Sequence, residues 1–231
     1  MDKLRERKDA LDRFDSLIRA PQTREQEWQG FFSSNPFVLT DYLPLRLTAV
    51  YPQVQLESGR PDFAFFEFPN PPVELGYYGV IELKRPQDKI LRVYSEKHIF
   101  PSAAMSLARE QVRHYLDDLT RTHEISNQYS LAMATAGYAF IIIGRTEEVI
   151  RKCGSDLHKL QLRQMLPGGM QLVTFDDLFA RFGHNVGDRS RLFILDVPTL
   201  RATTDRPMEP GRFQLIFDEF YKNGGRATGT S

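Results

Sequence analysis

The sequence predicts an α/β fold in which a mixed central sheet is flanked by helices. Three features of the 231-residue chain predict this class: three consecutive extended segments between residues 45 and 84, a strongly apolar segment at residues 138–145, and amphipathic helical patterns around them. Consecutive strands followed by alternating helices and strands are typical of a mixed sheet with helices on its faces. The expected core order is therefore α-β-β-β-α-β.

Two helices are expected first. Residues 1–20 carry apolar side chains at helical spacing, and Pro21 ends this pattern. A Thr-x-x-Gln capping box that starts at Thr23 predicts a second helix, which Asn35-Pro36 stops. The apolar stripe of this second helix consists of Trp28, Phe31 and Phe32.

Three strands are expected next, in a meander. Residues 45–56 alternate loosely between apolar and polar, and Gly59 turns the chain into a second strand at residues 61–66. A proline-rich turn leads to a third strand at residues 77–84. The third strand is mostly apolar, as a central buried strand should be.

The remaining elements follow from the same patterns. Residues 87–101, rich in Lys, Arg and Tyr, are expected to form a loop, and residues 102–119 a helix with an apolar repeat near 3.6. The strand at residues 138–145 is expected to be buried on both faces. Further expected elements are one or two helices within residues 147–166, a strand at 170–174, a helix at 175–182 capped near Thr174, a strand at 191–197 and a helix at 213–221.

We expect the chain to have three parts. These are an N-terminal helix in residues 1–22, a main domain in residues 23–185, and a C-terminal extension in residues 186–231 whose end is disordered. No internal repeat or linker interrupts the main domain.

Composition bounds the compartment and the partners. The formal net charge is zero, with 30 basic and 30 acidic residues, which argues against a surface that coats nucleic acid throughout. No segment is apolar enough to span a membrane, and the charged N-terminus lacks a secretory signal. A single cysteine, Cys153, excludes an intrachain disulfide framework. We expect a cytoplasmic protein.

The candidate catalytic residues lie on the second and third strands. Glu82 and Lys84 fall on one face of the third strand because successive side chains alternate, and Asp62 can reach that face from the start of the second strand. Two carboxylates suit a hard divalent cation, Mg²⁺ or Mn²⁺. The cation would polarise a phosphate and activate water, while Lys84 would orient the nucleophile or offset charge. The ordinary alternative is a solvated strand edge with a salt bridge.

Helical residues can add to this set. Glu25 lies closer than Glu27 to the direction of the apolar stripe, so Glu25 is the better candidate for a further metal ligand. The alternative for both is a glutamate that stabilises the first helical turn. Gln111 shares a helix face with Tyr115 and could hydrogen-bond a phosphate or a metal-bound water. Tyr115 alone reads as a core residue.

Basic residues follow the third strand. Residues 84–114 contain seven Lys or Arg and three Asp or Glu, so this segment has a charge of 7 − 3 = +4. A local basic groove could hold DNA phosphates. The candidate DNA-binding residues are Arg60, Arg85, Lys89, Arg92 and Arg113.

The Asp62 and Glu82-Leu83-Lys84 pattern resembles the active site of the PD-(D/E)XK nuclease superfamily, and the expected element order resembles its restriction-endonuclease-like core. Further blocks resemble the Shedu-type antiviral nuclease domain, in order over roughly residues 23–182. These blocks are residues 25–36, 60–63, 80–86, 111–115, 143–145 and 172–178.

The Shedu resemblance implies a DNA nuclease of prokaryotic antiviral defence that assembles as a homo-oligomer, a dimer or a tetramer. It implies that Asp62 and Glu82 are metal ligands, that Lys84 is the catalytic lysine, that Glu25 assists the metal and that Gln111 contacts the scissile region. A regulatory protein partner is also expected, because an unrestrained nuclease would harm its host.

Two other functions fit the same fold. One is a catalytically silent or partner-activated nucleic-acid-binding module, for which Lys84→Ala would leave function unchanged. The other is a structure-specific DNA repair nuclease, which a preference for ends, flaps or junctions would separate from a defence enzyme. The five histidines are scattered without metal-ligand spacing, and no glycine-rich phosphate loop is present.

Overall fold

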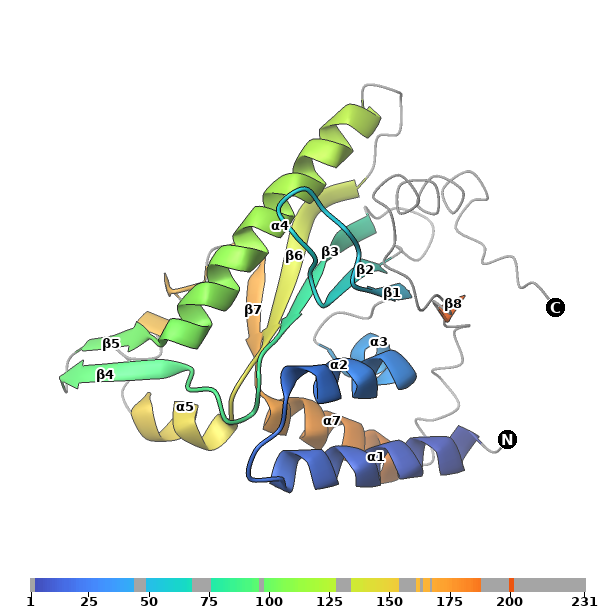
Figure 1. The fold of residues 1–231 in the computed structure, drawn as a ribbon, viewed down its shortest axis with the longest axis vertical. Coiled ribbons are helices and arrows are strands. Elements are labelled where there is room, and N and C mark those ends of the chain that lie inside the picture. The colour runs from blue at the N-terminus through green and yellow to red at the C-terminus, as the bar shows by residue number, and fades with distance from the viewer. Residues whose placement is uncertain are drawn as a thin grey trace.

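A mixed sheet with helices on both faces forms the centre of the protein (Figure 1). The computed structural model describes residues 3–43, 49–67, 76–95, 98–127, 134–153, 161–162, 164–166, 168–187 and 200–201. The helices are α1 (Lys3–Arg19), α2 (Glu25–Ser34), α3 (Phe37–Tyr42), α4 (Ala103–Asn127), α5 (Thr146–Lys152) and α7 (Phe175–Gly187). The strands are β1 (Ala49–Pro52), β2 (Phe63–Glu67), β3 (Gly76–Leu83), β4 (Leu91–Ser95), β5 (His98–Pro101), β6 (Ala134–Ile142), β7 (Met170–Val173) and β8 (Leu200–Arg201).

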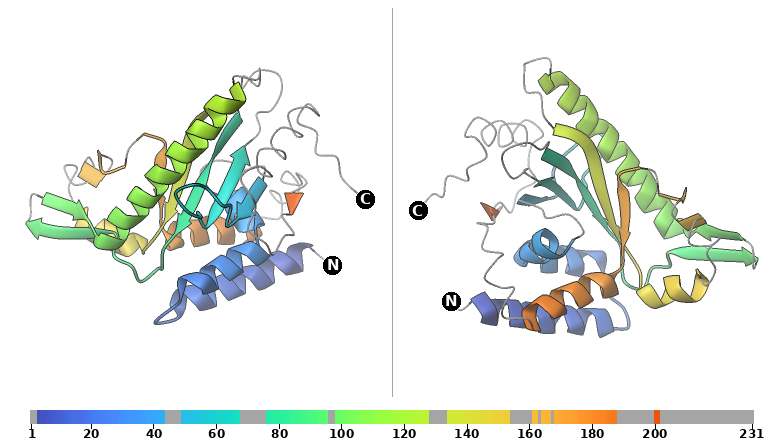
Figure 2. Two further views of the ribbon diagram at one scale, coloured as in Figure 1. Left: turned by 45° about the horizontal axis from the view of Figure 1, so that its top comes forward. Right: turned by 180° about the vertical axis from the view of Figure 1, so that it is seen from behind.

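The sheet has the strand order β7-β6-β3-β2-β1-β8. Strands β1, β2 and β3 form an antiparallel meander, β6 pairs parallel with β3, and β7 pairs parallel with β6. The parallel crossover from β3 to β6 contains α4, which lies across one face of the sheet (Figures 1 and 2). The predicted mixed α/β class is confirmed.

Side-chain alternation divides the core into two layers. On β6 and just after it, Ala139, Ile141 and Ile143 pack with the α4 side, whereas Phe140 and Ile142 pack with the opposite side, beneath α1, α2, α3 and α7. Residues 139–143 are buried on both faces of the sheet, as predicted from their composition. On β3, Val80 belongs to the α4 layer and Ile81 and Leu83 to the other. Glu82 therefore shares the α4-facing side of the sheet.

Helix α1 packs tightly on the rest of the fold. Its Phe14 is fully buried, with ring centroids 5.2 Å from those of Trp28 and Phe31 on α2 and 6.5 Å from that of Phe182 on α7. This aromatic cluster fills the layer beneath the sheet. The division of the chain at residue 22 stays a prediction, since the packing joins α1 to α2 and α7.

The segment predicted as a loop at residues 87–101 contains a β-hairpin instead. Strands β4 and β5 pair antiparallel in a separate two-stranded sheet that extends to one side of the molecule (Figures 1 and 2). The loop prediction was wrong because a hairpin with one exposed face needs few apolar residues. Among the strand residues whose side chains the structure describes, Leu91 and Ile99 are the buried ones.

The predicted capping box at Thr23 was also wrong. The backbone N–H of Arg24 donates to the side chain of Glu27 at 2.6 Å, so Arg24 is the N-cap of α2. Thr23 has another role because the buried indole N–H of Trp28 needs an acceptor. The Thr23 hydroxyl accepts this hydrogen bond at 2.9 Å and donates to Gln87 at 3.1 Å.

Other boundaries differ modestly from the predicted ones. Helix α2 ends before Asn35-Pro36 as predicted, but the short helix α3 follows directly and was not predicted. Helix α4 extends to Asn127, and the Thr174 hydroxyl caps α7 by accepting the backbone N–H of Asp177 at 3.1 Å. The predicted strand at 191–197, the helix at 213–221 and the disordered end lie outside the described residues. Within the described helices, none is both long and apolar enough to cross a membrane.

Candidate active site

Asp62 and Glu82 meet where β2 begins and β3 ends. The β2–β3 register pairs Phe63 with Ile81, so the next residues outward, Asp62 and Glu82, are neighbours. Asp62 is fixed further because the backbone N–H of Leu83 donates to its carboxylate at 2.6 Å. Both acids are buried. Sequence alternation and strand pairing thus bring together two carboxylates that lie 20 residues apart.

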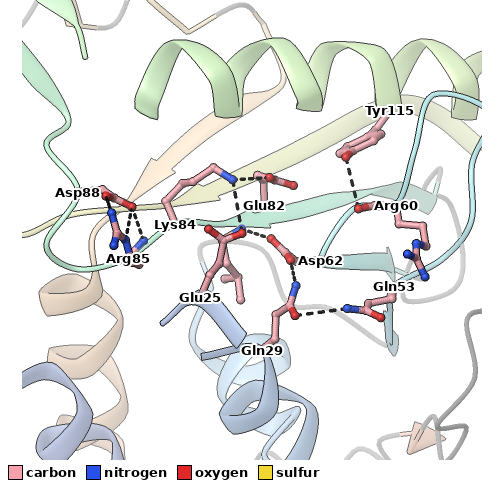
Figure 3. A network of polar contacts seen from close by, with 11 residues as sticks. Glu25, Gln29, Gln53, Arg60, Asp62, Glu82, Lys84, Arg85, Asp88 and Tyr115 are labelled. Carbon is pink, nitrogen blue, oxygen red and sulfur yellow. Dashed lines mark hydrogen bonds and ion pairs between the residues drawn. The ribbon is translucent and has the colours of Figure 1, made fainter. Parts of the chain in front are cut away.

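Lys84 completes the strand motif. Its Nζ atom donates to Glu82 Oε1 at 2.7 Å and lies 3.7 Å from Glu25 Oε1 (Figure 3). The lysine is buried, and its backbone N–H donates to Ile142 on β6 at 2.9 Å. Its ammonium group is therefore held among the carboxylates instead of extending into solvent.

Glu25 supplies a third carboxylate from the first turn of α2. Carboxylate oxygens of Glu25, Asp62 and Glu82 all lie within 4.8 Å of one another. Glu27 is engaged elsewhere, because its side chain caps the start of α2 through Arg24. The geometry thus brings Glu25, and not Glu27, to the acidic cluster formed by Glu25, Asp62 and Glu82.

Burial makes Asp62 and Glu82 hard to ionise. Burial raises the pKa of Glu82 to about 8, and the charge of Asp62 adds to this rise while Lys84 opposes it. Burial likewise raises the pKa of Asp62 to about 6, opposed by hydrogen bonds from Leu83 and Gln29. For Lys84, burial acts to lower the pKa, but the charge of Glu82 and the hydrogen bond to it raise it on balance. The raised pKa values of the two buried acids mean that their ionised forms lack sufficient compensation from the protein alone.

Gln29 is a site residue that the sequence analysis did not single out. It lies one helical turn after Glu25, and its side-chain amide donates to Asp62 Oδ1. The side-chain oxygen of Gln29, Oε1, accepts in turn from Gln53 Nε2 at 3.3 Å (Figure 3). Gln53 has a left-handed backbone, with φ of 48°, and its N–H donates to the carbonyl of Asp62 at 2.9 Å. These contacts orient Asp62 from both its backbone and its side chain.

Helix α4 adds Gln111 and Tyr115 on its sheet-facing side. Tyr115 is close enough for Glu82 and Asp62 to contribute to the rise of its pKa to about 12, which is mainly due to burial. It stays protonated and donates to the backbone carbonyl of Arg60 at 3.3 Å. The Oε1 atom of Gln111, one helical turn before Tyr115, is buried with no hydrogen-bond partner in the described part of the chain. That oxygen is available to a bound molecule.

A comparison with models of known protein families identifies the family of this chain. A family model described as "Shedu protein SduA, C-terminal" matches residues 22–179, more than half of the chain. This chain belongs to the Shedu family. A comparison with curated proteins found no match. The Shedu match contains all the residues of the acidic cluster, together with Lys84 and Gln111, and its family membership indicates a role in antiphage defence.

The predicted DNA-binding residues of this Shedu chain lie in different surroundings. Arg60 and Arg85 lie on opposite sides of the acidic cluster (Figure 3). Arg60 is exposed, whereas Arg85 forms an ion pair with Asp88 at 2.6 Å. Arg113 forms an ion pair with Glu110 on its own helix at 2.6 Å. Arg113 lies two residues before Tyr115, so at 100° per residue its side chain points toward nearly the opposite side of α4. The structure does not bring Arg113 to the acidic cluster.

Lys89 and Arg92 are exposed at the start of the β4–β5 hairpin, beyond Arg85 in the chain. A hollow of about 550 Å³ lies on the Arg85 side of the site. Its lining residues are Gln22, Thr23, Arg24, Gln26, Glu27 and Arg85. This polar hollow adjoins Glu25 in the chain and offers room for a polar ligand beside the acidic cluster.

The residues present in this Shedu site fit a divalent metal ion. All three clustered donors are carboxylate oxygens, the ligand type that Mg²⁺ and Mn²⁺ prefer. The cluster has three carboxyl groups and one ammonium group, and a divalent cation would favour the ionised forms of Asp62 and Glu82, which burial disfavours. The unpartnered Gln111 oxygen on the neighbouring helix suits a water molecule or substrate held near that ion.

Proposed function

We propose that this Shedu-family chain is a metal-dependent nuclease that hydrolyses phosphodiester bonds in DNA as part of antiphage defence. The observation that carries the proposal is the cluster of the buried Asp62 and Glu82 with the half-exposed Glu25, which has the buried Lys84 inside it. A buried carboxylate is costly unless a counter-charge offsets it, and the single Lys84 does not balance two buried carboxylates with a third beside them. A cluster of this kind is therefore better explained by metal binding than by stability.

The element order supports a PD-(D/E)XK core. Helix α2, the antiparallel meander β1-β2-β3, helix α4 and the parallel strand β6 follow one another as α-β-β-β-α-β, apart from the short α3 and the β4–β5 hairpin. In such a core, Asp62 before β2 and the Glu-x-Lys at the end of β3 would form the active site.

Each residue has a proposed task. Asp62, Glu82 and Glu25 would hold Mg²⁺ or Mn²⁺, which when bound would polarise the phosphate and lower the pKa of an attacking water. Lys84 can donate a hydrogen bond to the nucleophile or to a phosphate oxygen, since its raised pKa keeps it protonated. Gln111 would accept a hydrogen bond from water or substrate through its free oxygen.

DNA would lie across the acidic cluster. Arg60 on one side and Lys89 and Arg92 on the other are exposed cations that can contact phosphates directly. Arg85 and Arg113 would have to exchange their present acidic partners for a phosphate. We also propose a homo-oligomeric assembly, a dimer or a tetramer, to be measured by mass photometry.

The proposal is tested by cleavage of linear and circular duplex DNA. Wild type, Lys84→Ala and Asp62→Ala would be compared in Mg²⁺, in Mn²⁺ and in EDTA, with Lys8→Ala, an exposed lysine on α1, as the matched control. We expect cutting that needs metal and that falls by about 10³-fold or more in the two site variants while the control retains it. Absence of cutting under every condition would refute the proposed activity and favour a nucleic-acid-binding module.

A further inference from the structure

The β4–β5 hairpin presents two very different faces. Its inner side is seated on the body of the protein through the buried Leu91 and Ile99. Its outer side carries Arg92, Tyr94 and Phe100, which we name the outer face. Arg92 and Phe100 are directly opposite each other in the strand register, so their side chains share one side. The rings of Tyr94 and Phe100 are in edge-to-face contact, 5.5 Å apart, so Tyr94 joins them.

The outer face is unusually exposed for aromatic side chains. Tyr94 has 74% of its surface accessible and Phe100 has 47%. Scattered apolar residues on a surface are ordinary, but two exposed rings in contact with each other beside an arginine are typical of a binding surface. Tyrosine and arginine are among the side chains that contribute most of the binding free energy at interfaces.

The hairpin is held firmly in place. The backbone N–H groups of Ile90 and Leu91 donate to Glu148 on α5 at 3.0 and 3.4 Å, and Lys152 on α5 donates to the carbonyl of Leu91 at 2.6 Å. The base of the hairpin is fixed again where Ser102 N–H donates to Ile90 at 2.9 Å. Because the inner side is fixed, the outer face keeps its orientation without a ligand, which lowers the entropic cost of binding.

We propose that the outer face binds unpaired bases of the DNA substrate, with Tyr94 and Phe100 stacking on the bases and Arg92 contacting the backbone. The inference rests on the proposed nuclease function and names the form of DNA that this nuclease prefers. Aromatic rings stack on any exposed base, and arginine adds charge attraction to the strand. In an intact duplex the base faces are hidden, so the hairpin would favour DNA with a single-stranded stretch.

Charge favours DNA over a protein partner. The described strands of the hairpin contain Arg92 and no acidic residue, and Lys89 lies exposed just before β4. Between the strands, the sequence Glu96-Lys97 adds no net charge. Within the described part of the chain, the Arg92 side chain donates to a neutral group, the backbone carbonyl of Pro101, at 3.5 Å. A cationic surface with exposed rings suits a polyanion with stackable bases.

A DNA strand bound at the acidic cluster can also reach the outer face of the hairpin. Arg92 follows Lys84 by eight residues. A fully extended chain of that length spans at most about 28 Å, or roughly eight base steps of DNA. A strand passing over the acidic cluster can therefore reach the hairpin, along the side where Arg85 and Lys89 are exposed.

The test measures binding without cleavage. In a Lys84→Ala background and in EDTA, fluorescence anisotropy would follow a labelled single-stranded oligonucleotide and a duplex of the same length. We expect Tyr94→Ala/Phe100→Ala to weaken single-strand binding about tenfold or more and duplex binding less than twofold. Leu107→Ala, which removes an apolar side chain 58% exposed on α4, is the matched control and should change neither.

Stacking has its own readout. A single-stranded probe that contains 2-aminopurine should lose fluorescence on binding the Lys84→Ala protein, because the reporter base stacks on a ring. The loss should disappear in Tyr94→Ala/Phe100→Ala and persist in Tyr94→Phe, which keeps the ring. Arg92→Gln should reduce the salt dependence of binding by about one phosphate contact.

Three results would overturn the inference: unchanged single-strand affinity in the double variant, equal losses for single strand and duplex, or unchanged DNA binding together with a change in the mass of the assembly. The last would identify the outer face as a protein interface. These outcomes are separate from failure of the proposed nuclease, which would be seen as absence of metal-dependent cutting by the wild type whatever the hairpin binds.

Discussion

Glu82 and Asp62 make the free energy of unfolding depend on pH. Their pKa values in the folded protein, about 8 and about 6, lie above the ordinary 4.5 and 3.8, so the folded state binds protons more tightly than the unfolded chain. Their contribution to stability is therefore fully present below about pH 4 and is lost as pH rises toward 8. Each unit of pKa difference between the folded and the unfolded state corresponds to about 1.4 kcal/mol in the free energy of unfolding.

We expect urea unfolding in EDTA to show a lower free energy of unfolding at pH 8.5 than at pH 5. Glu82→Gln should flatten most of this slope, and Mg²⁺ should reduce it by balancing the charge. Glu147→Gln, at an exposed glutamate on α5, is the control and should keep the wild-type slope. A wild-type slope of the opposite sign would show that burial does not govern these carboxyl groups.

Gln29 should tune the metal affinity of the site without touching the metal. Gln29→Leu removes the amide that orients Asp62, and loss of such a supporting contact lowers metal affinity about 10–100-fold. Calorimetric titration with Mn²⁺ would measure this directly. Gln26→Leu makes the same change at an exposed position of α2 and should leave the affinity unaltered. Equal affinities in all three proteins would remove Gln29 from the site.

The sequence allowed the strand residues of the site to be predicted but not their supports. Glu82 and Lys84 follow from period-two alternation, and Asp62 from the neighbouring strand, because these relations are local. Gln29 and Gln53 carried no local signal. A glutamine on a helix reads as solvated until the fold places an acid opposite it, and that requires the contact between α2 and the end of β3.

At the scale of elements, Gly79 sets how closely β3 and β6 can pair. A Cβ atom added there would lie 1.7 Å from the carbonyl oxygen of Tyr138 and 2.8 Å from the Phe65 ring. We expect Gly79→Ala to lower the free energy of unfolding by about 3 kcal/mol or more, because the central strands must separate. Equilibrium urea unfolding would measure it.

Gly30→Ala is the matched control for that experiment. A Cβ at Gly30 would meet nothing within 4 Å, and the residue lies inside α2, where alanine is favoured over glycine by about 1 kcal/mol. The same substitution should therefore stabilise the protein at one position and destabilise it at the other. Similar effects at both would contradict the close approach of β3 and β6.

The elements that were predicted well share a strong apolar period, as in α4, β6 and the meander. The β4–β5 hairpin was missed because its outer face replaces apolar residues with Arg92 and with rings that face solvent. Helix α3 was missed because six residues after Asn35-Pro36 give too short a window for a helical repeat. In both cases tertiary contacts, and not local pattern, decide the structure.

At the scale of the whole molecule, α1 is required for stability. Phe14→Ala would leave a cavity among the rings of α2 and α7 and should cost about 3–5 kcal/mol of the free energy of unfolding. Ile150→Ala, at an exposed apolar residue of α5, should cost little. A small effect of Phe14→Ala in urea unfolding would mean that α1 is dispensable.

The same aromatic cluster has a mechanical consequence. Phe14 is wedged between rings of α2 and α7, and α2 carries Glu25 at its first turn. Close-packed rings have no slack, so a force that tilts α1 also tilts α2. A displacement of α1 would therefore be expected to displace α2 as well, and with it the Glu25 carboxylate of the acidic cluster.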